Sequence, residues 1–161
     1  MYKIGIITVS DKGSRGERED RSGPAIREIA ESLGEVTSYQ VLPDDLDVLI
    51  EGLVNLSDKK RVDLIFTSGG TGLSARDNTP EATLAVIDRE VPGLAEAMRM
   101  ESMKKTNRAM LSRAVSGVRN RTLIVNLPGS VKAVRECLDV IMPALPHGLE
   151  ILTGRGGECG S

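Results

Sequence analysis

Apolar residues in this chain fall into two patterns, short continuous runs and longer stretches in which they recur at helical spacing. The short runs predict β-strands over residues 3–9, 36–42, 62–66 and 122–126. Between them, apolar residues at intervals of three and four predict amphipathic helices. These predicted helices cover residues 24–33, 46–53, 80–88 and 92–104, and a last one that runs from 131 up to Pro143. Residues 11–21 are predicted as a charged loop, with Ser22 or Gly23 as the cap of the helix that starts at Pro24.

Strands that alternate with amphipathic helices predict an α/β fold, here a single three-layer αβα domain with a mainly parallel sheet over residues 1–154. Residues 114–118 are predicted to pair with the last strand through a turn at 119–121. Residues 107–113 form either a short helical piece or a loop. Pro143 and Pro146 are expected to end the last helix, with one further turn and a mobile Gly-rich tail over 155–161.

Small, acidic or glycine residues follow each of the four predicted parallel strands. In an open parallel sheet, ligands bind outside the carboxyl ends of the strands. The four strand ends should therefore converge on one ligand site. They are Ser10-Asp11, Pro43-Asp44, the loop that begins at Ser68 and Gly69, and the Asn126 to Ser130 segment.

The run Thr67-Ser-Gly-Gly-Thr-Gly72 forms a glycine-rich loop directly after a buried strand. Thr79 is predicted as the N-cap of the next helix, with Pro80 at its first position. Glycines expose backbone N–H groups that bind phosphates. The loop lacks the Lys-Ser/Thr pair of a P-loop, and its match to a dinucleotide fingerprint is rejected because the helix opens at Thr79. A glycine-rich turn without any ligand is the simpler alternative.

Two aspartates beside this loop are candidate ligands of a metal ion. Asp77 follows Arg76 within the loop, where it either holds Mg²⁺ or is merely solvated. Asp44 lies between a strand and a helix, where it either caps the helix or shares that Mg²⁺ with Asp77. Ser130 is expected to cap the helix after the second backbone loop, Pro128-Gly129-Ser130, and that helix N-terminus would also suit a phosphate.

Bulk composition argues against several classes of function. The net charge of −2, the absence of Trp and an aromatic content of 2% disfavour nucleic-acid binding. No apolar run is long enough to span a membrane and no leader pattern opens the sequence, so a cytoplasmic protein is expected. Cys137 and Cys159 lack metal-ligand spacing, and the single His147 is interpreted as structural, which disfavours zinc or histidine-based chemistry.

Basic residues concentrate in one segment, residues 99–135, which makes up less than a quarter of the chain. Residues 99–135 contain nine of the 21 Lys and Arg residues and one of the 23 acidic residues, Glu101. This stretch is either a solvated face or subunit contact, or an anion site for a multiply phosphorylated substrate. The nine are Arg99, Lys104, Lys105, Arg108, Arg113, Arg119, Arg121, Lys132 and Arg135.

Nearly the whole chain resembles the MogA/MoaB-type molybdopterin adenylyltransferases, a fold family that includes the G domain of gephyrin. The resemblance is carried by motifs from one end of the chain to the other, among them GGTG, which on its own also resembles CinA-like proteins. These motifs are Thr8-Val-Ser-Asp11, Gly16, Asp20, Ser22-Gly-Pro24, Pro43-Asp44, Gly69-Gly-Thr-Gly72, Arg76-Asp-x-Thr-Pro-Glu-Ala-Thr83, Glu90-Val-Pro-Gly93, Ala109-Met-Leu-Ser-Arg113 and Asn126-Leu-Pro-Gly-Ser130.

The resemblance implies an enzyme of molybdenum cofactor biosynthesis that transfers AMP from Mg-ATP to the terminal phosphate of molybdopterin and releases pyrophosphate. It further implies a homotrimer, and hand-over of the product to a molybdate-inserting enzyme. By motif position, Asp44 and Asp77 match the catalytic, Mg²⁺-holding aspartates. The nucleotide-facing residues would be Gly69, Gly70, Thr71, Gly72, Pro128, Gly129 and Ser130, and the molybdopterin-facing residues Ser10, Asp11, Asp20, Ser22, Ser112 and Arg113.

The chemistry of the candidate residues agrees with this activity. A phosphate nucleophile is already ionised near neutral pH, so the reaction needs no strong base, and charge stabilisation by Mg²⁺ with Arg76 or Arg113 should dominate. Two alternatives stay open. One is a non-catalytic pterin-binding carrier, since some members of the family lack activity, and the other is a CinA-like nucleotide or pyridine-compound hydrolase.

Overall fold

Six strands form one sheet in the order β2-β1-β3-β6-β5-β4 in a computed structural model that describes residues 1–155. Strand β1 pairs in parallel with β2 on one side and with β3 on the other, and β3 pairs in parallel with β6. The hairpin of β5 and β6, and the pairing of β5 with β4, are antiparallel. The strands are β1 (Tyr2–Val9), β2 (Gly34–Leu42), β3 (Leu64–Ser68), β4 (Arg89–Glu90), β5 (Ser116–Arg119) and β6 (Thr122–Leu127).

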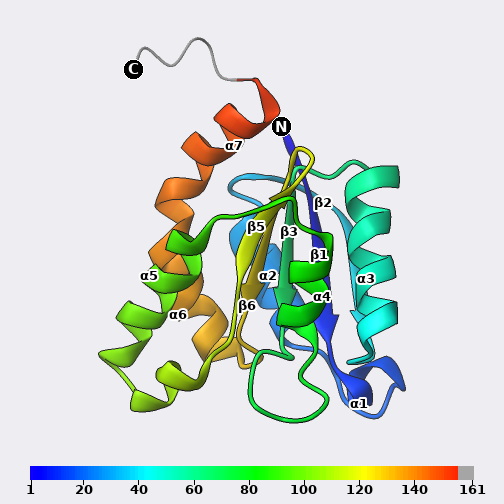
Figure 1. The fold of residues 1–161 in the computed structure, drawn as a ribbon, viewed down its shortest axis with the longest axis vertical. Helices are drawn as coiled ribbons and strands as arrows, with labels where there is room; N and C mark the ends of the chain where they lie inside the picture. Colours follow the sequence, from blue (N-terminus) through cyan, green and yellow to red (C-terminus); the bar gives the residue numbers. More distant parts are fainter. Residues whose placement is uncertain (156–161) are drawn as a thin grey trace.

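Helices cover both faces of this sheet, which makes the three layers predicted from the sequence (Figure 1). The α-helices are α1 (Asp11–Ser14), α2 (Ser22–Ala30), α3 (Leu46–Val54), α4 (Thr79–Val86), α5 (Pro92–Met103), α6 (Val131–Ile141) and α7 (Leu145–Thr153). Shorter helical segments are η1 (Asn55–Lys59), η2 (Asn107–Leu111) and η3 (Met142–Ala144).

The two hydrophobic cores lie on opposite faces because side chains alternate along each strand. Ile4, Ile6 and Phe66 point into a core that α2, α5, α6 and α7 complete. Ile7 and Ile65, which alternate with them, point into a second core under α3 and α4. The strands are apolar on both faces, as a covered parallel sheet requires.

The carboxyl ends of β1, β2, β3 and β6 meet at one edge of the sheet, as the sequence predicts. In Figure 1 the glycine loop after β3 and the short helix α1 lie at that lower end, while the N-terminus and the β5–β6 hairpin lie at the other. Ser130 caps α6 by accepting a hydrogen bond from the backbone N–H of Ala133, as expected. The hairpin turn places Asn120 at a φ of 53°.

Four local predictions were wrong, and one strand was missed. The charged loop after β1 begins with helix α1, which Ser10 caps by accepting from the N–H of Gly13. Helix α2 starts at Ser22 itself, so neither Ser22 nor Gly23 is its cap. Thr79 is the first residue of α4, and Asn78 is the N-cap.

Pro146 does not end a helix but lies in the first turn of the nine-residue helix α7. Proline fits there because a backbone N–H in the first turn of a helix has no acceptor within that helix. Strand β4 was not predicted.

Residues 156–161 fall outside the described part of the chain, and with them most of the predicted Gly-rich tail and Cys159. Within residues 1–155, the helices are too short to cross a lipid bilayer, the longest being α5 with 12 residues.

Candidate functional site

The glycine loop is held closed by its own backbone and by Thr79. The hydroxyl of Thr79 donates to the carbonyl oxygen of Gly69 at 2.8 Å, and its N–H donates to the carbonyl oxygen of Gly70. Gly69 and Gly70 have positive φ angles of 96° and 69°. A Cβ atom on Gly70 would lie 2.3 Å from the Thr79 hydroxyl, so only glycine fits this turn.

Asp44 is buried against this loop and does not cap α3. Its Oδ1 accepts a hydrogen bond of 2.9 Å from the N–H of Asn78, and the cap of α3 is its neighbour, Asp45. Burial raises the pKa of Asp44; the hydrogen bonds from Asn78 oppose this, and repulsion by Asp77 and Asp11 adds to it. The structure therefore places the partly desolvated carboxylate of Asp44 near the carboxylates of Asp77 and Asp11.

Asp77 folds back over the start of the loop. Its Oδ2 accepts a hydrogen bond of 2.8 Å from the N–H of Ser74, and a Cβ atom on Gly72 would lie 2.8 Å from that oxygen. Asp77 therefore lies beside the glycines from within the same β3–α4 connection, and Asp44 reaches them from the end of β2, so both aspartates lie beside the glycines as the sequence predicts.

The two aspartates have a donor set that suits Mg²⁺. One carboxylate oxygen of each accepts a hydrogen bond from a backbone N–H, and among residues 1–155 no hydrogen bond reaches the other oxygen of either. Within the same residues, no group of three His, Cys, Asp or Glu side chains is arranged to hold a metal ion. Mg²⁺ commonly combines one or two carboxylates with substrate phosphates and water, so two aspartates meet the requirement only together with a phosphorylated substrate.

Arg76 and Asp11 form a bidentate ion pair on the same edge. Nε and Nη2 of Arg76 each donate to one oxygen of Asp11 at 2.8 Å. Oδ1 of Asp11 also accepts the backbone N–H of Asp44 at 2.9 Å. The hydrogen bonds from Arg76 and Asp44 lower the pKa of Asp11 to about 2. Arg76 therefore braces the segment that carries Asp44.

Asp20 is saturated by hydrogen bonds from three elements. Its carboxylate accepts from the hydroxyls of Thr8, Ser22 and Tyr39 and from the N–H groups of Ser22 and Gly23. Burial would raise the pKa of Asp20, but the hydrogen bonds from Tyr39, Thr8 and Ser22 outweigh it and the pKa is lowered. Asp20 fixes the start of α2 against β1 and β2.

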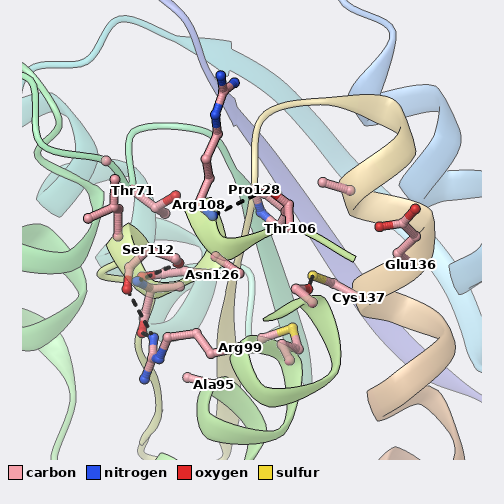
Figure 2. A pocket seen from close by; sticks show the side chains of 17 residues that line it. Thr71, Ala95, Arg99, Thr106, Arg108, Ser112, Asn126, Pro128, Glu136 and Cys137 are labelled. Atoms are coloured by element: carbon pink, nitrogen blue, oxygen red, sulfur yellow. Dashed lines mark hydrogen bonds between the residues drawn. The ribbon is translucent and has the colours of Figure 1, made fainter. Parts of the chain in front are cut away.

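Two pockets flank the glycine loop and the Pro128–Ser130 loop. The first, here the α5 pocket, has a volume of about 320 Å³ (Figure 2). Its lining is mainly apolar, with Ala95, Met98, Leu111 and Cys137. Burial raises the pKa of the Cys137 thiol, which keeps it neutral. Polar lining residues include Thr71, Arg99, Arg108, Ser112 and Glu136.

The second pocket, here the β1 pocket, has a volume of about 680 Å³ and a more polar lining. It lies at the end of β1 and the N-terminus of α6 and shares no lining residue with the α5 pocket. Its lining includes Ser10, Asp20, Ser22, Ser68, Gly129 and Ser130.

The predicted molybdopterin residues are therefore not brought together. Ser112 lines the α5 pocket, whereas Ser10, Asp20 and Ser22 line the β1 pocket beside the predicted nucleotide residues Gly129 and Ser130. Pro128 and Gly72 line the α5 pocket. Asp11 and Arg113 line neither pocket and pair with Arg76 and Glu81.

The basic stretch over 99–135 is largely neutralised within the chain. Five of its nine basic side chains pair with acidic residues: Lys104, Lys105, Arg113, Arg119 and Arg135. Arg99 donates to the carbonyl oxygens of Ser112 and Ala114. Arg108 lines the same pocket as Arg99, but its guanidinium has neither an acidic partner nor a carbonyl acceptor in residues 1–155. Figure 2 shows its side chain extending away from the other labelled side chains. The sequence did not single it out from the other eight.

Comparison with known proteins adds independent information. The protein family described as "probable molybdopterin binding domain" matches residues 5–147. The molybdopterin adenylyltransferase of Helicobacter pylori strain J99 is 42% identical over 94% of this chain and 88% of its own length. Gephyrin of Dictyostelium discoideum is 39% identical over 94% of this chain, which covers 23% of gephyrin.

Among solved structures, the molybdopterin biosynthesis enzyme MoaB of Thermus thermophilus superposes with a TM-score of 0.91. It is 53% identical to this chain, covering 96% of this chain and 98% of that one.

Proposed function

Since the chain belongs to the family described as a probable molybdopterin binding domain, we propose that it is a molybdopterin adenylyltransferase of molybdenum cofactor biosynthesis. In this reaction an oxygen of the terminal phosphate of molybdopterin attacks the α-phosphorus of ATP. One P–O bond forms, the bond between the α- and β-phosphates breaks, and pyrophosphate leaves with the electron pair. The products are adenylylated molybdopterin and pyrophosphate.

The observation that carries this proposal is the pair of pockets on either side of two backbone loops. A transfer between two substrates needs two binding sites that meet where the bond is exchanged, and here the loops after β3 and β6 lie between the α5 pocket and the β1 pocket. A carrier that only stores a pterin needs one pocket.

We assign the nucleotide to the β1 pocket and molybdopterin to the α5 pocket. The β1 pocket contains Gly129 and Ser130 at the N-terminus of α6, a position that favours phosphate. In this assignment Ser10, Asp20 and Ser22 face the nucleotide and not the pterin. The α5 pocket offers an apolar lining to a flat ring system, with Ser112 and Thr71 as polar contacts.

The residues around the loops match the chemistry. Molybdopterin phosphate is an oxyanion near pH 7, so no general base is required, and the described site contains no histidine. The barrier is repulsion between phosphates, which backbone N–H groups and cations lower. Mg²⁺ held by Asp44 and Asp77 would neutralise the pyrophosphate leaving group.

Arg108 is proposed as the cation that meets the negative charge of molybdopterin. It lines the α5 pocket and its guanidinium has no acidic partner among residues 1–155, whereas Arg76 and Arg113 are both engaged in ion pairs. Arg76 keeps a role at the reaction centre through Asp11 and the backbone of Asp44.

The family resemblance extends the proposal to assembly and location. We propose a cytoplasmic homotrimer that passes its product to a molybdate-inserting enzyme. Exposed apolar side chains such as Met100, Met103 and Met110 give the protein surface for subunit or partner contacts. Size-exclusion chromatography with light scattering tests the trimer.

Purified protein, molybdopterin and Mg-ATP provide the direct test. We expect adenylylated molybdopterin by mass spectrometry and an equal amount of pyrophosphate, both dependent on Mg²⁺. Pterin that binds without being adenylylated would support the carrier alternative. Nucleotide breakdown without a pterin acceptor would support the CinA-like hydrolase.

A further inference from the structure

The guanidinium of Arg113 spans the segment from Gly72 to Asp77, which follows the glycines in the connection between β3 and α4. Its Nε donates to the carbonyl oxygen of Gly72 at 2.7 Å, and its Nη2 donates to the carbonyl oxygen of Asp77, also at 2.7 Å. The backbone N–H of Arg113 donates to the carbonyl oxygen of Thr71 at 2.9 Å. One residue from the segment before β5 therefore ties both ends of the 72–77 segment.

Glu81 orients this guanidinium. Nη1 of Arg113 donates to both carboxylate oxygens of Glu81, at 2.9 and 2.7 Å. Glu81 lies in the first turn of α4, so the pair anchors the loop to a helix. All three guanidinium nitrogens are thus committed to protein acceptors, two of them to backbone carbonyls.

The carboxylate of Asp77 depends on the geometry that Arg113 fixes. Its Oδ2 is bonded to the N–H of Ser74 and lies over Gly72, so its place follows from the positions of Gly72 and Asp77 in the loop. We infer that Arg113 is a positioning residue that sets Asp77 through the backbone, with Glu81 as its orienting partner, and that it is not a ligand of the substrate phosphate. As far as it concerns catalysis, this inference rests on the proposed function.

The substitution Arg113→Lys separates the two roles. A phosphate ligand keeps much of its effect as lysine because the charge remains. A lysine has one nitrogen on a flexible stem and cannot contact Gly72, Asp77 and Glu81 in the fixed geometry of a guanidinium. Arg135→Lys is the matched control, because Arg135 also pairs with a glutamate, Glu28, and lines none of the pockets described here.

The first readout needs no substrate. Hydrogen–deuterium exchange of the ligand-free protein follows the amides of Ser74, Asp77 and Thr79, which are bonded within the loop. We expect Arg113→Lys to speed their exchange by about tenfold or more, because charge-assisted hydrogen bonds hold the loop shut. Arg135→Lys should leave these amides unchanged. Unchanged loop exchange in Arg113→Lys would overturn the inference.

The second readout is kinetic. Arg113→Lys should lower kcat and raise the Mg²⁺ concentration for half-maximal activity, with KM for molybdopterin within about twofold of the wild type. A raised KM with normal kcat and normal Mg²⁺ dependence would make Arg113 a substrate ligand and overturn the inference. Glu81→Gln should show the same pattern more weakly, and it replaces Arg113→Lys if that variant does not fold.

The two proposals fail in different ways. Wild-type protein that makes no adenylylated product contradicts the proposed function, and the exchange experiment still decides whether Arg113 positions the loop. Active wild-type protein with an Arg113→Lys loop that exchanges normally contradicts the positioning role alone.

Discussion

Oδ1 of Asp44 accepts a hydrogen bond of 2.9 Å from the backbone N–H of Asn78, the residue that follows Asp77. The contact joins the end of β2 to the end of the glycine loop, 34 positions apart in the chain. The two candidate catalytic aspartates are therefore coupled through the backbone, and a change at one of them bears on the other.

Asp44→Asn should make the protein more stable and less active. Because burial raises the pKa of Asp44, the folded state binds a proton there more tightly than the unfolded state, and the ionised carboxylate costs stability above the folded pKa. A neutral asparagine removes that cost and can still accept from Asn78. We expect a higher Tm at pH 7 and a loss of about 100-fold or more in adenylyl transfer.

Asp45→Asn is the matched control for this prediction. Asp45 caps α3, and asparagine is as good a cap as aspartate, so Tm and activity should both stay near the wild-type values. Full activity in Asp44→Asn would contradict the assignment of Asp44 to the reaction.

Gly70→Ala should damage the site, and Gly93→Ala should not. Gly70 has a φ of 69°, and a Cβ atom there would lie 2.3 Å from the Thr79 hydroxyl and 2.8 Å from Oδ2 of Asp44. We expect a destabilisation of at least about 1 kcal/mol, measured by urea unfolding, together with loss of transfer. Gly93, in the first turn of α5, has no atom within 4 Å of its Cβ position, so Gly93→Ala should be neutral or slightly stabilising.

Arg108→Ala should weaken the binding of molybdopterin without slowing the chemical step. Loss of a charge-assisted contact to a phosphate is expected to raise KM for molybdopterin about tenfold, with kcat within about twofold of the wild type. The wild-type KM should also rise with salt, and that of the variant less so. Arg121→Ala, in the β5–β6 turn at the other end of the sheet, is the control. Equal KM values for the wild type, Arg108→Ala and Arg121→Ala would contradict the assignment of Arg108 to the molybdopterin site.

Asp11→Asn should lower stability at neutral pH but not at strongly acidic pH. The Arg76 guanidinium holds the pKa of Asp11 at about 2, below the value of about 3.9 expected for an unfolded chain. The stabilisation is therefore complete above about pH 4 and is lost as the pH falls toward 2. Urea unfolding of both proteins at pH 7, 4 and 3 should show a gap that narrows with acid, and a constant gap would contradict the ion pair as its source.

The sequence predicts the layers and the ligand edge well because both follow from short-range pattern. Runs such as Ile4–Val9 and Leu64–Phe66 are apolar on both faces, which only a covered sheet explains. Parallel strands bring their carboxyl ends to one edge whatever their order, so the convergence of Asp11, Asp44 and Ser68 needed no knowledge of that order.

Two kinds of detail were harder to predict: which of two neighbouring residues caps a helix, and which distant segments line the same pocket. Nothing local decides which of Asp44 and Asp45 caps α3, because either carboxylate reaches a free N–H of the first turn. The separation of Ser112 from Ser10 depends on the sheet order, since α5 and α2 cover the same face at different strands. The sequence predicts Thr79 as a helix cap, whose hydroxyl would accept from a backbone N–H. In the structure the buried hydroxyl donates instead to the carbonyl oxygen of Gly69.

The closed glycine loop also has a thermodynamic consequence. Thr79, Asp77 and Arg113 already satisfy its backbone before any ligand arrives, so little conformational freedom remains to be lost when a phosphate binds. The conformational entropy that a flexible loop would lose on binding a ligand has here already been lost on folding. Calorimetric titration of nucleotide should accordingly show a heat-capacity change set by the apolar surface of the ligand alone, without the larger negative contribution that accompanies the ordering of a segment.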